Sequence, residues 1–333
     1  MMIRKFLIIF ISFYLFYSCS DSVPDVSNIK IDDKIVRMDE IIFEKDVEQI
    51  DKWLPEVSEE YSSFMSIYTS QVIIAGGLNS RQYIRKMKYF IVYTNTFEID
   101  KAIKENFVNF NEIEEKVNNS LKFYKYYYPK GEIPKIYSFI SGFNQSVIIG
   151  PDFIGVGLDK YLGKNSHFYD RMKTANYIRY KANKNFIPAD LMRALAYYKY
   201  DYPDETVNLL NKIIYEGKIQ YFVDKMLPYD NDTLKIAYKP EQIEWCKNNE
   251  ENVWTWFVEN RKLMSTDFME IKKYCDEAPF TSDFSKESPG RIGVWIGWQI
   301  VRSYMEHNKD ITLPELMAED DFQKIMNMSK YNP

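Results

Sequence analysis

The chain's two histidines, His167 and His307, are the first residues to consider for catalysis, and neither has the neighbours that such chemistry needs. A catalytic zinc site usually takes two imidazoles one helical turn apart, a third ligand and an open position for water. That spacing is missing here, so we expect no metal or other cofactor. Both histidines are expected at the surface, His307 at a helix C-terminus where positive charge is favourable. A Ser-His-Asp or Cys-His arrangement stays open, although no G-x-S-x-G motif occurs.

The N-terminus predicts export and the attachment of lipid at Cys19. Two basic residues precede an apolar run at residues 6–17, which is too short to span a bilayer and is typical of a signal peptide. Ser18 places a small residue directly before Cys19, as in the cleavage pattern of bacterial lipoproteins. We therefore expect a signal peptide at residues 1–18 and acyl chains on Cys19 that hold the protein on a membrane facing the periplasm. An ordinary signal peptide with an incidental cysteine, or an uncleaved anchor, is the alternative.

The rest of the chain predicts a tether followed by one domain. Residues 19–30 are mostly polar and include Pro24, so we expect a lipid-anchored tether there. Residues 31–333 are expected to form a single globular domain, and the 27 Tyr and 22 Phe of the chain supply ample apolar surface for its core. The net charge of −5 and the lack of a long basic run argue against nucleic acid as a partner.

The two remaining cysteines, Cys246 and Cys275, leave two possibilities open. An exported protein can oxidise such a pair to a disulfide. Nothing in the sequence brings the two residues together, however, so separate buried thiols are the favoured interpretation.

Apolar periodicity predicts an α+β fold that is mostly helical. Residues 31–43 alternate between apolar and polar positions and predict a first strand. Three short runs rich in β-forming residues, separated by glycines, predict a small antiparallel sheet in the middle of the chain; they lie at residues 135–141, 146–149 and 153–158. Helical spacing covers most of the remainder, at residues 56–72, 80–106, 113–128, 186–200, 204–216, 241–260, 290–307 and 313–328.

The predicted helix at residues 290–307 carries an unusual stripe of glycines. Gly290, Gly293 and Gly297 fall on one side of it, and each glycine costs a helix about 1 kcal/mol relative to alanine. We therefore expect another backbone to pack closely against this stripe. Arg291 and Arg302 lie on roughly one side of the same helix. They either pair with carboxylates or reach out of the core, or they bind an anion or a peptide.

Several segments, in this order along the chain, resemble the gliding-motility lipoprotein GldB family of Bacteroidota. They are Ile-Ser-Gly-Phe-Asn at 140–144, Gly-Val-Gly-Leu-Asp-Lys-Tyr-Leu-Gly at 155–163, Asp-Leu-Met-Arg-Ala at 190–194, Ile-Tyr-Glu-Gly-Lys at 214–218 and the run at 287–305. The resemblance implies an accessory role in gliding motility and in the secretion machinery associated with it.

This family also resembles predicted zinc peptidases that carry an HExxH helix, which implies a zincin-like fold. In that comparison Met192, Arg193 and Ala196 take the positions of the His, Glu and His of the motif. Glu216 and Gly217 match the Glu-Gly pair that supplies a third ligand. A thioether, a cation and a methyl group cannot hold zinc or activate water. The resemblance therefore implies a degenerate metallopeptidase domain with no catalytic residues.

The resemblance nominates Arg193, Glu216 and Arg291 as residues of a degenerate cleft. Arg193 is expected to pair with Glu216 and replace the charge of the lost metal, or else to point to solvent. The expected function is that of a scaffold or binding component, lipid-anchored in the cell envelope, whose partners are the membrane and other proteins of the gliding and secretion apparatus. Two alternatives remain: a hydrolase that uses carboxylates such as Glu216 or Asp190, and a lipoprotein that binds a peptide or a sugar.

Overall fold

The computed structural model describes residues 23–31, 33–203 and 208–333. The predicted signal peptide and Cys19 lie outside these residues. None of the helices in the described part of the chain is long and apolar enough to cross a membrane. The segment predicted as a tether is partly packed, because Val26 is buried in the core and Ile29 packs against it.

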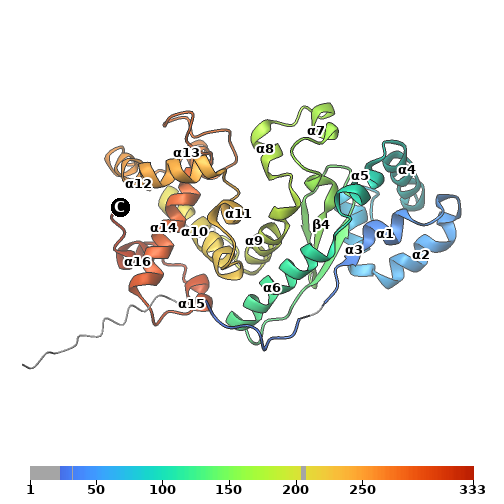
Figure 1. The fold of residues 1–333 in the computed structure, drawn as a ribbon, viewed down its shortest axis with the longest axis horizontal. Coiled ribbons are helices and arrows are strands. Elements are labelled where there is room, and N and C mark those ends of the chain that lie inside the picture. Colours follow the sequence, from blue (N-terminus) through green and yellow to red (C-terminus); the bar gives the residue numbers. More distant parts are fainter. Residues whose placement is uncertain (1–22, 32, 204–207) are drawn as a thin grey trace, which may run out of the picture.

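The N-terminal part of the described chain is helical and lies beside the sheet, at the blue end of Figure 1. The strand predicted at residues 31–43 is short: β1 covers only Val36–Arg37, and a helix follows at once. The helices of this part are α1 Met38–Phe43, α2 Ile50–Glu60, α3 Ser62–Ile67, α4 Tyr83–Thr96, α5 Ile99–Asn106 and α6 Asn111–Tyr127, with one turn of π-helix at Tyr68–Val72.

The predicted small sheet is present, but it is mixed and not antiparallel. Its order is β1-β2-β4-β3, with β2 at Lys135–Phe139, β3 at Val147–Ile149 and β4 at Phe153–Gly157. β2 pairs in parallel with β1 and β4, and the β3–β4 pair is antiparallel. The physical reason is burial: every residue of β4 is buried, which favours a central place, whereas the three-residue β3 suits an edge.

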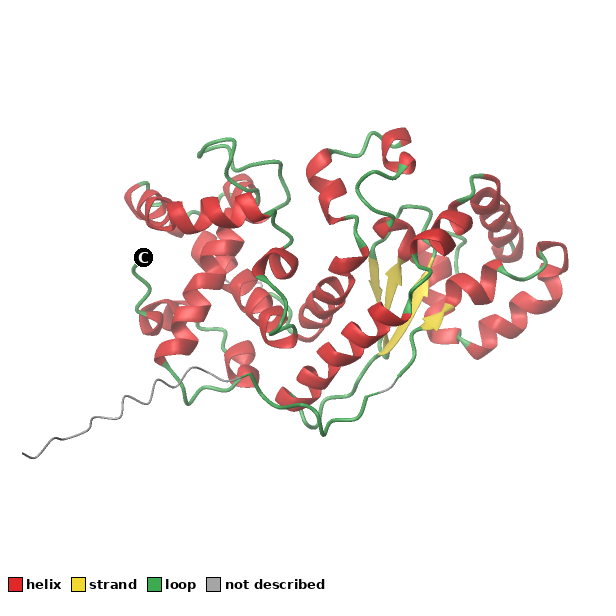
Figure 2. Cartoon of the chain, in the orientation of Figure 1, coloured by secondary structure: helices red, strands yellow, loops and turns green. Residues whose placement is uncertain are grey.

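The sheet is covered on both faces, as Figure 2 shows. On one face the ring of Phe64, from α3, stacks on Tyr137 with ring centroids 4.9 Å apart and also contacts Phe139 and Phe153. Against β3 and β4 packs α9, Ile187–Lys199, which matches the helix predicted at 186–200. The sheet therefore fixes the position of α9, the helix that carries Asp190 and Arg193.

The C-terminal part is a cluster of helices, drawn from yellow to red in Figure 1. The helix predicted at 204–216 begins at Leu209 among the described residues and extends to Met226, and the one predicted at 313–328 is divided in two. The bounds are α10 Leu209–Met226, α11 Asp232–Ile236, α12 Pro240–Glu259, α13 Phe268–Cys275, α14 Ile292–His307, α15 Leu313–Ala318 and α16 Phe322–Ser329.

The glycine stripe packs against another backbone, as its sequence predicts. A Cβ added at Gly297 would lie 1.6 Å from the carbonyl oxygen of Ile213, and one added at Gly217 would lie 2.2 Å from the backbone of Gly297. The helices α10 and α14 therefore cross in backbone contact at these two glycines. Gly217, matched above to a peptidase motif, serves this crossing.

Candidate functional site

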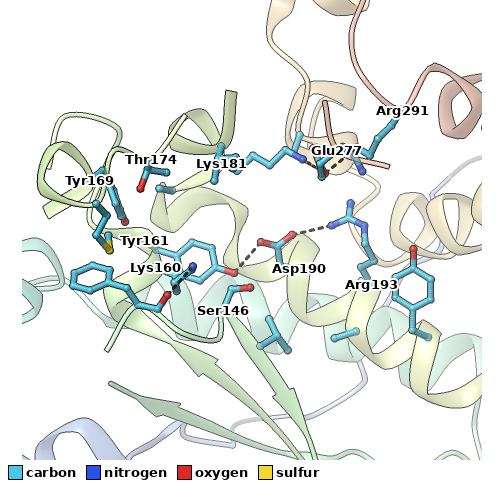
Figure 3. Close-up of a pocket in the computed structure, with 18 residues that line it drawn as sticks. Ser146, Lys160, Tyr161, Tyr169, Thr174, Lys181, Asp190, Arg193, Glu277 and Arg291 are labelled. Carbon is cyan, nitrogen blue, oxygen red and sulfur yellow. Dashed lines mark hydrogen bonds and ion pairs between the residues drawn. The ribbon is translucent and has the colours of Figure 1, made fainter. Parts of the chain in front are cut away.

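A cavity of about 520 Å³ lies where α9 and the loop before β3 face the C-terminal cluster of helices. Its walls come from the loop before β3, from α9, from the segments beside α11 and α14, and from an arm at residues 163–186. The arm contains α7, His167–Arg171, and α8, Asn176–Lys181, and rises above the sheet in Figure 1. Two of the three predicted cleft residues, Arg193 and Arg291, line this cavity, as Figure 3 shows.

One side of the cavity carries a chain of hydrogen bonds based on α9. The hydroxyl of Tyr161 donates to Asp190 Oδ2 at 2.8 Å, and Arg193 Nη1 donates to Asp190 Oδ1 at 2.8 Å. Asp190 and Arg193 are three residues apart on α9, the spacing at which side chains meet on a helix. Burial, and then the charge of Asp190, raises the pKa of Tyr161 well above its usual value, so Tyr161 stays protonated and donates.

The C-terminal end of α11 accepts hydrogen bonds from both Arg193 and Arg291. Arg193 Nη2 donates to the carbonyl oxygen of Lys235 at 2.5 Å and to Gln220 Oε1 at 3.3 Å. Arg291 Nη2 donates to the next carbonyl, that of Ile236, also at 2.5 Å. The last carbonyls of a helix lack partners within it and favour cations, so this helix end orients the two guanidinium groups.

Across the cavity a second chain of contacts joins the arm to the C-terminal helices. Glu277 forms ion pairs with Lys181, on α8, and with Arg291 Nε, the latter at 2.9 Å. Burial raises the pKa of the Glu277 carboxyl, but Arg291 and Lys181 outweigh it and hold that pKa below its ordinary value. For Lys181, burial and the nearby charge of Arg291 lower the pKa to about 7, and Glu277 only partly opposes them.

The predicted pair between Arg193 and Glu216 does not form. Arg193 pairs with Asp190, which lies on its own helix, whereas Glu216 lies behind the cavity wall on α10. Lys212 Nζ lies 2.7 Å from Glu216 Oε1, and the hydroxyl of Tyr197 donates to Glu216 Oε2 at 2.5 Å. Arg193 is thus paired with a carboxylate of its own helix, and Glu216 with a lysine of its own helix. Tyr197 lines the cavity, so Glu216 reaches it indirectly.

A buried carboxylate, Asp159, shapes the loop that closes the cavity next to the sheet. It is fully buried and accepts hydrogen bonds from Ser141 N at 2.8 Å, from Ser141 Oγ at 2.9 Å and from Phe143 N. Gly142 and Phe143 both have positive φ, so the loop takes a conformation that these bonds must stabilise. Lys160 Nζ then donates to the Phe143 carbonyl at 3.1 Å, and both residues line the cavity.

A family model for the gliding motility protein GldB matches residues 19–333, which is nearly the whole chain. The chain belongs to this family. It is therefore a gliding-motility protein. A search of curated proteins found no match, and a search of solved structures found none either.

The geometry gives the segments that resemble the GldB family a physical role. Residues 140–144 and Asp159 build the loop described above, Asp190 and Arg193 line the cavity, and Gly217 forms the crossing with α14. Met192 and Ala196, to which the predicted likeness to zinc peptidases assigns the histidine positions, are fully buried in the core. Of that motif's positions on α9, Arg193 is the one whose side chain reaches the cavity.

The remaining sequence candidates lie elsewhere in this GldB-family chain. His167 and His307 are exposed, and His307 is the last residue of α14, as predicted. Cys246 and Cys275 are separate, buried free thiols. Across residues 23–31, 33–203 and 208–333, no group of three or more His, Cys, Asp or Glu side chains is placed to hold a metal ion.

Arg302, which lies within α14, pairs with carboxylates, which is one of the two roles its sequence allowed. Its guanidinium binds Asp224 at 2.9 Å and Asp232 at 3.0 Å and lies 3.7 Å above the ring of Trp298. Lys235 Nζ also binds Asp224, at 2.6 Å. This network fastens α11 to α10 and α14, and so fixes the carbonyl groups that hold Arg193 and Arg291.

Sequence reasoning missed Lys181, Glu277 and Tyr161. Lys181 ends a helix that buries none of its residues, so no apolar periodicity marks it. Glu277 follows α13 in a loop, and its partners come from distant parts of the chain. Tyr161 lies within the segment 155–163, so the resemblance was the one signal that pointed to it.

Proposed function

We propose that this gliding-motility protein is a lipid-anchored, non-catalytic component of the envelope machinery, and that its cavity binds an extended segment of a partner polypeptide. The observation that carries the proposal is the cavity itself, where Arg193 and Arg291 converge beside aromatic and aliphatic side chains. Binding sites commonly combine such apolar walls with a few oriented polar groups.

Lipid anchoring is supported by two features of the N-terminus. An apolar run with basic residues ahead of it precedes Cys19. The region that matches the family begins at the same residue, as expected if the mature protein begins there. Acyl chains on Cys19 would place the domain at a membrane surface facing the periplasm, beside the other envelope proteins that gliding requires.

An extended ligand is supported by a second cavity next to the first. It has a volume of about 440 Å³ and shares Lys181, Ala237 and Glu277 with the first, so the two cavities adjoin at the arm. A polypeptide suits two adjoining cavities, because its side chains can enter the apolar parts while its backbone meets polar groups.

A non-catalytic role is supported by the state of the available carboxylates. Asp190 accepts hydrogen bonds from Tyr161 and Arg193, and Glu216 from Tyr197, with Lys212 beside it. These partners occupy the oxygens that a general base would use. The relation to zinc peptidases stays a prediction, because it rests on the resemblance alone.

The test is to fill the cavity without disturbing the fold. Ser146 lines the cavity, and its neighbour Gln145 does not, although both side chains are exposed. Ser146→Trp and the matched control Gln145→Trp are introduced into cells that depend on this protein for gliding, and protein level and melting temperature are measured beside motility. We expect Ser146→Trp to abolish gliding at normal protein level and the control to glide normally.

Two results decide against the proposal. If cells with Ser146→Trp glide like the parent, the cavity has no part in the function. If the purified protein hydrolyses peptides and Asp190→Asn or Glu216→Gln stops it, the protein is a hydrolase and the non-catalytic role is wrong.

A further inference from the structure

The charged residues that line the cavity include more cations than anions. Four of them are cations, each from a different segment of the chain, namely Lys160, Lys181, Arg193 and Arg291. Two are anions, Asp190 and Glu277. The cavity therefore carries an excess of positive charge within a protein whose net charge is −5. An excess of fixed cations in a partly buried site favours an anionic ligand.

The carboxylate between Lys181 and Arg291 is more exposed than either cation. Arg291 is 12% exposed and is fixed from behind by the Ile236 carbonyl, whereas the side chain of Glu277 is 47% exposed at the cavity rim. Lys181, at 25%, is also more buried than Glu277. A carboxylate from outside can therefore replace Glu277 on Lys181 and Arg291 while Glu277 turns to water.

We infer that the cavity recognises a carboxylate carried by a polypeptide, and that this carboxylate binds Lys181 and Arg291 in the place that Glu277 takes in the unbound protein. The inference rests on the proposed polypeptide-binding function and names its chemistry. Arg291 suits this role because a guanidinium presents several N–H donors in one plane, which matches the two oxygens of a carboxylate. Among the described contacts, Arg291 Nε pairs with Glu277 and Nη2 donates to the Ile236 carbonyl. Nη1 is therefore available to a ligand.

Proton uptake is a consequence that can be measured. The groups facing Lys181 are Arg291, Glu277 and Arg193, so two cations oppose its protonation and one carboxylate favours it. With a pKa of about 7, Lys181 is partly deprotonated at neutral pH. When a ligand carboxylate takes the place of Glu277 on Lys181 and Glu277 stays at the cavity rim, the negative charge near Lys181 increases, which favours the ammonium form. Binding should therefore take up protons near neutral pH.

The experiment uses short peptides as probes for the soluble protein from Cys19 onward. Peptides of alanine with one central Asp, Glu, Asn or Gln are made with both ends blocked, and an all-alanine peptide is made with a free C-terminal carboxylate. Titration calorimetry in two buffers of different ionisation enthalpy gives the affinity and the protons taken up. We expect at least one carboxylate-bearing peptide to bind about tenfold or more tightly than its uncharged counterpart, as charge-assisted hydrogen bonds imply. The blocked acidic peptides and the free C-terminus distinguish the two sources of carboxylate.

Variants identify the residues. Glu277→Gln removes the internal competitor and should tighten binding several-fold, whereas the matched control Asp276→Asn, an exposed neighbour paired with Lys272, should leave it unchanged. Lys181→Met should weaken binding about tenfold and remove the proton uptake, and its control Lys184→Met should do neither. Melting temperatures show whether each variant is folded.

The outcomes separate this inference from the function on which it rests. If uncharged and acidic peptides bind equally, recognition of a carboxylate is overturned while polypeptide binding stands. If Glu277→Gln weakens binding, Glu277 contributes to binding the ligand and does not compete with the ligand carboxylate for Lys181 and Arg291. That result also overturns the inference. If no peptide binds and Ser146→Trp leaves gliding intact, both are wrong.

Discussion

Arg193, on α9, and Arg291, the residue directly before α14, donate hydrogen bonds to the neighbouring carbonyl groups of Lys235 and Ile236. Adjacent carbonyls at one helix end therefore bring two cations into the same cavity wall. Like charges repel, so the arrangement requires compensation, and Asp190 and Glu277 provide it, one carboxylate for each arginine.

Removing one of these arginines should destabilise the protein. Arg193→Met leaves Asp190 and the Lys235 carbonyl without their cation, so we expect the free energy of unfolding to fall by about 1–3 kcal/mol. Arg171→Met changes the same charge at an exposed position and should stay within about 0.5 kcal/mol of the parent. Urea unfolding of both proteins checks this. Equal stability would mean that the contacts of Arg193 contribute nothing to the fold.

The crossing of α10 and α14 should not tolerate a side chain at Gly297. Alanine favours a helix over glycine by about 1 kcal/mol, so helix propensity alone would stabilise Gly297→Ala. The new Cβ would lie 1.6 Å from the Ile213 carbonyl oxygen, however, and relieving that overlap must separate the helices. We expect a net loss of about 3 kcal/mol in thermal or urea unfolding. Glu306→Ala, at an exposed site on the same helix, is the control, and an unchanged stability of Gly297→Ala would contradict the close crossing.

Asp159 should be essential to the loop that bears Phe143. In Asp159→Asn an amide N–H₂ replaces one of the two oxygens that accept the bonds from Ser141 and Phe143, so a donor faces a donor. We expect a loss of about 1–3 kcal/mol together with weaker binding of the acidic peptides. Asp310→Asn, at an exposed position, should change neither property. Normal peptide affinity in Asp159→Asn would separate this loop from the site.

Sequence reasoning succeeded where apolar periodicity is strong and failed where distant contacts decide. The helices at 187–199, 240–259 and 292–307 were predicted to within two residues, because each has a long periodic face. The sequence predicts an antiparallel sheet because it cannot show that β4 lies between β2 and β3. Arg193 lines the cavity, but the partner that the resemblance implied is wrong, since Asp190 on the same helix is the nearer carboxylate. Lys181 and Glu277 meet through the arm, which no local pattern predicts.

Lys181 should make the protein more stable as the pH rises above neutrality. Its pKa is about 7 in the folded protein and near the ordinary lysine value of 10.5 in the unfolded chain, so between these values the unfolded chain binds more protons. The contribution of Lys181 to the free energy of unfolding therefore rises with pH across that window and stays nearly constant below about pH 7. Lys218, buried and with a pKa lowered to about 8, acts in the same direction, so the parent alone cannot assign the effect.

The assignment comes from urea unfolding of the parent, Lys181→Met and Lys184→Met at pH values from about 7 to about 9. Lys181→Met should show a smaller rise than the parent, and Lys184→Met the same rise. Identical pH dependence in all three proteins would contradict the lowered pKa.

Lipid attachment at Cys19 should decide where the protein acts. Acyl chains bind membranes through burial of their methylene groups, at about 0.8 kcal/mol for each, and a protein without them has no such hold. We expect the parent to incorporate labelled palmitate and to sediment with membranes, and Cys19→Ala to lose both properties and to stop gliding. Cys275→Ala is the matched control, because that thiol is buried within the domain and should not affect labelling. A Cys19→Ala protein that still carries palmitate would mean that the lipid is attached elsewhere. Loss of label with intact gliding would mean that the domain works without its anchor.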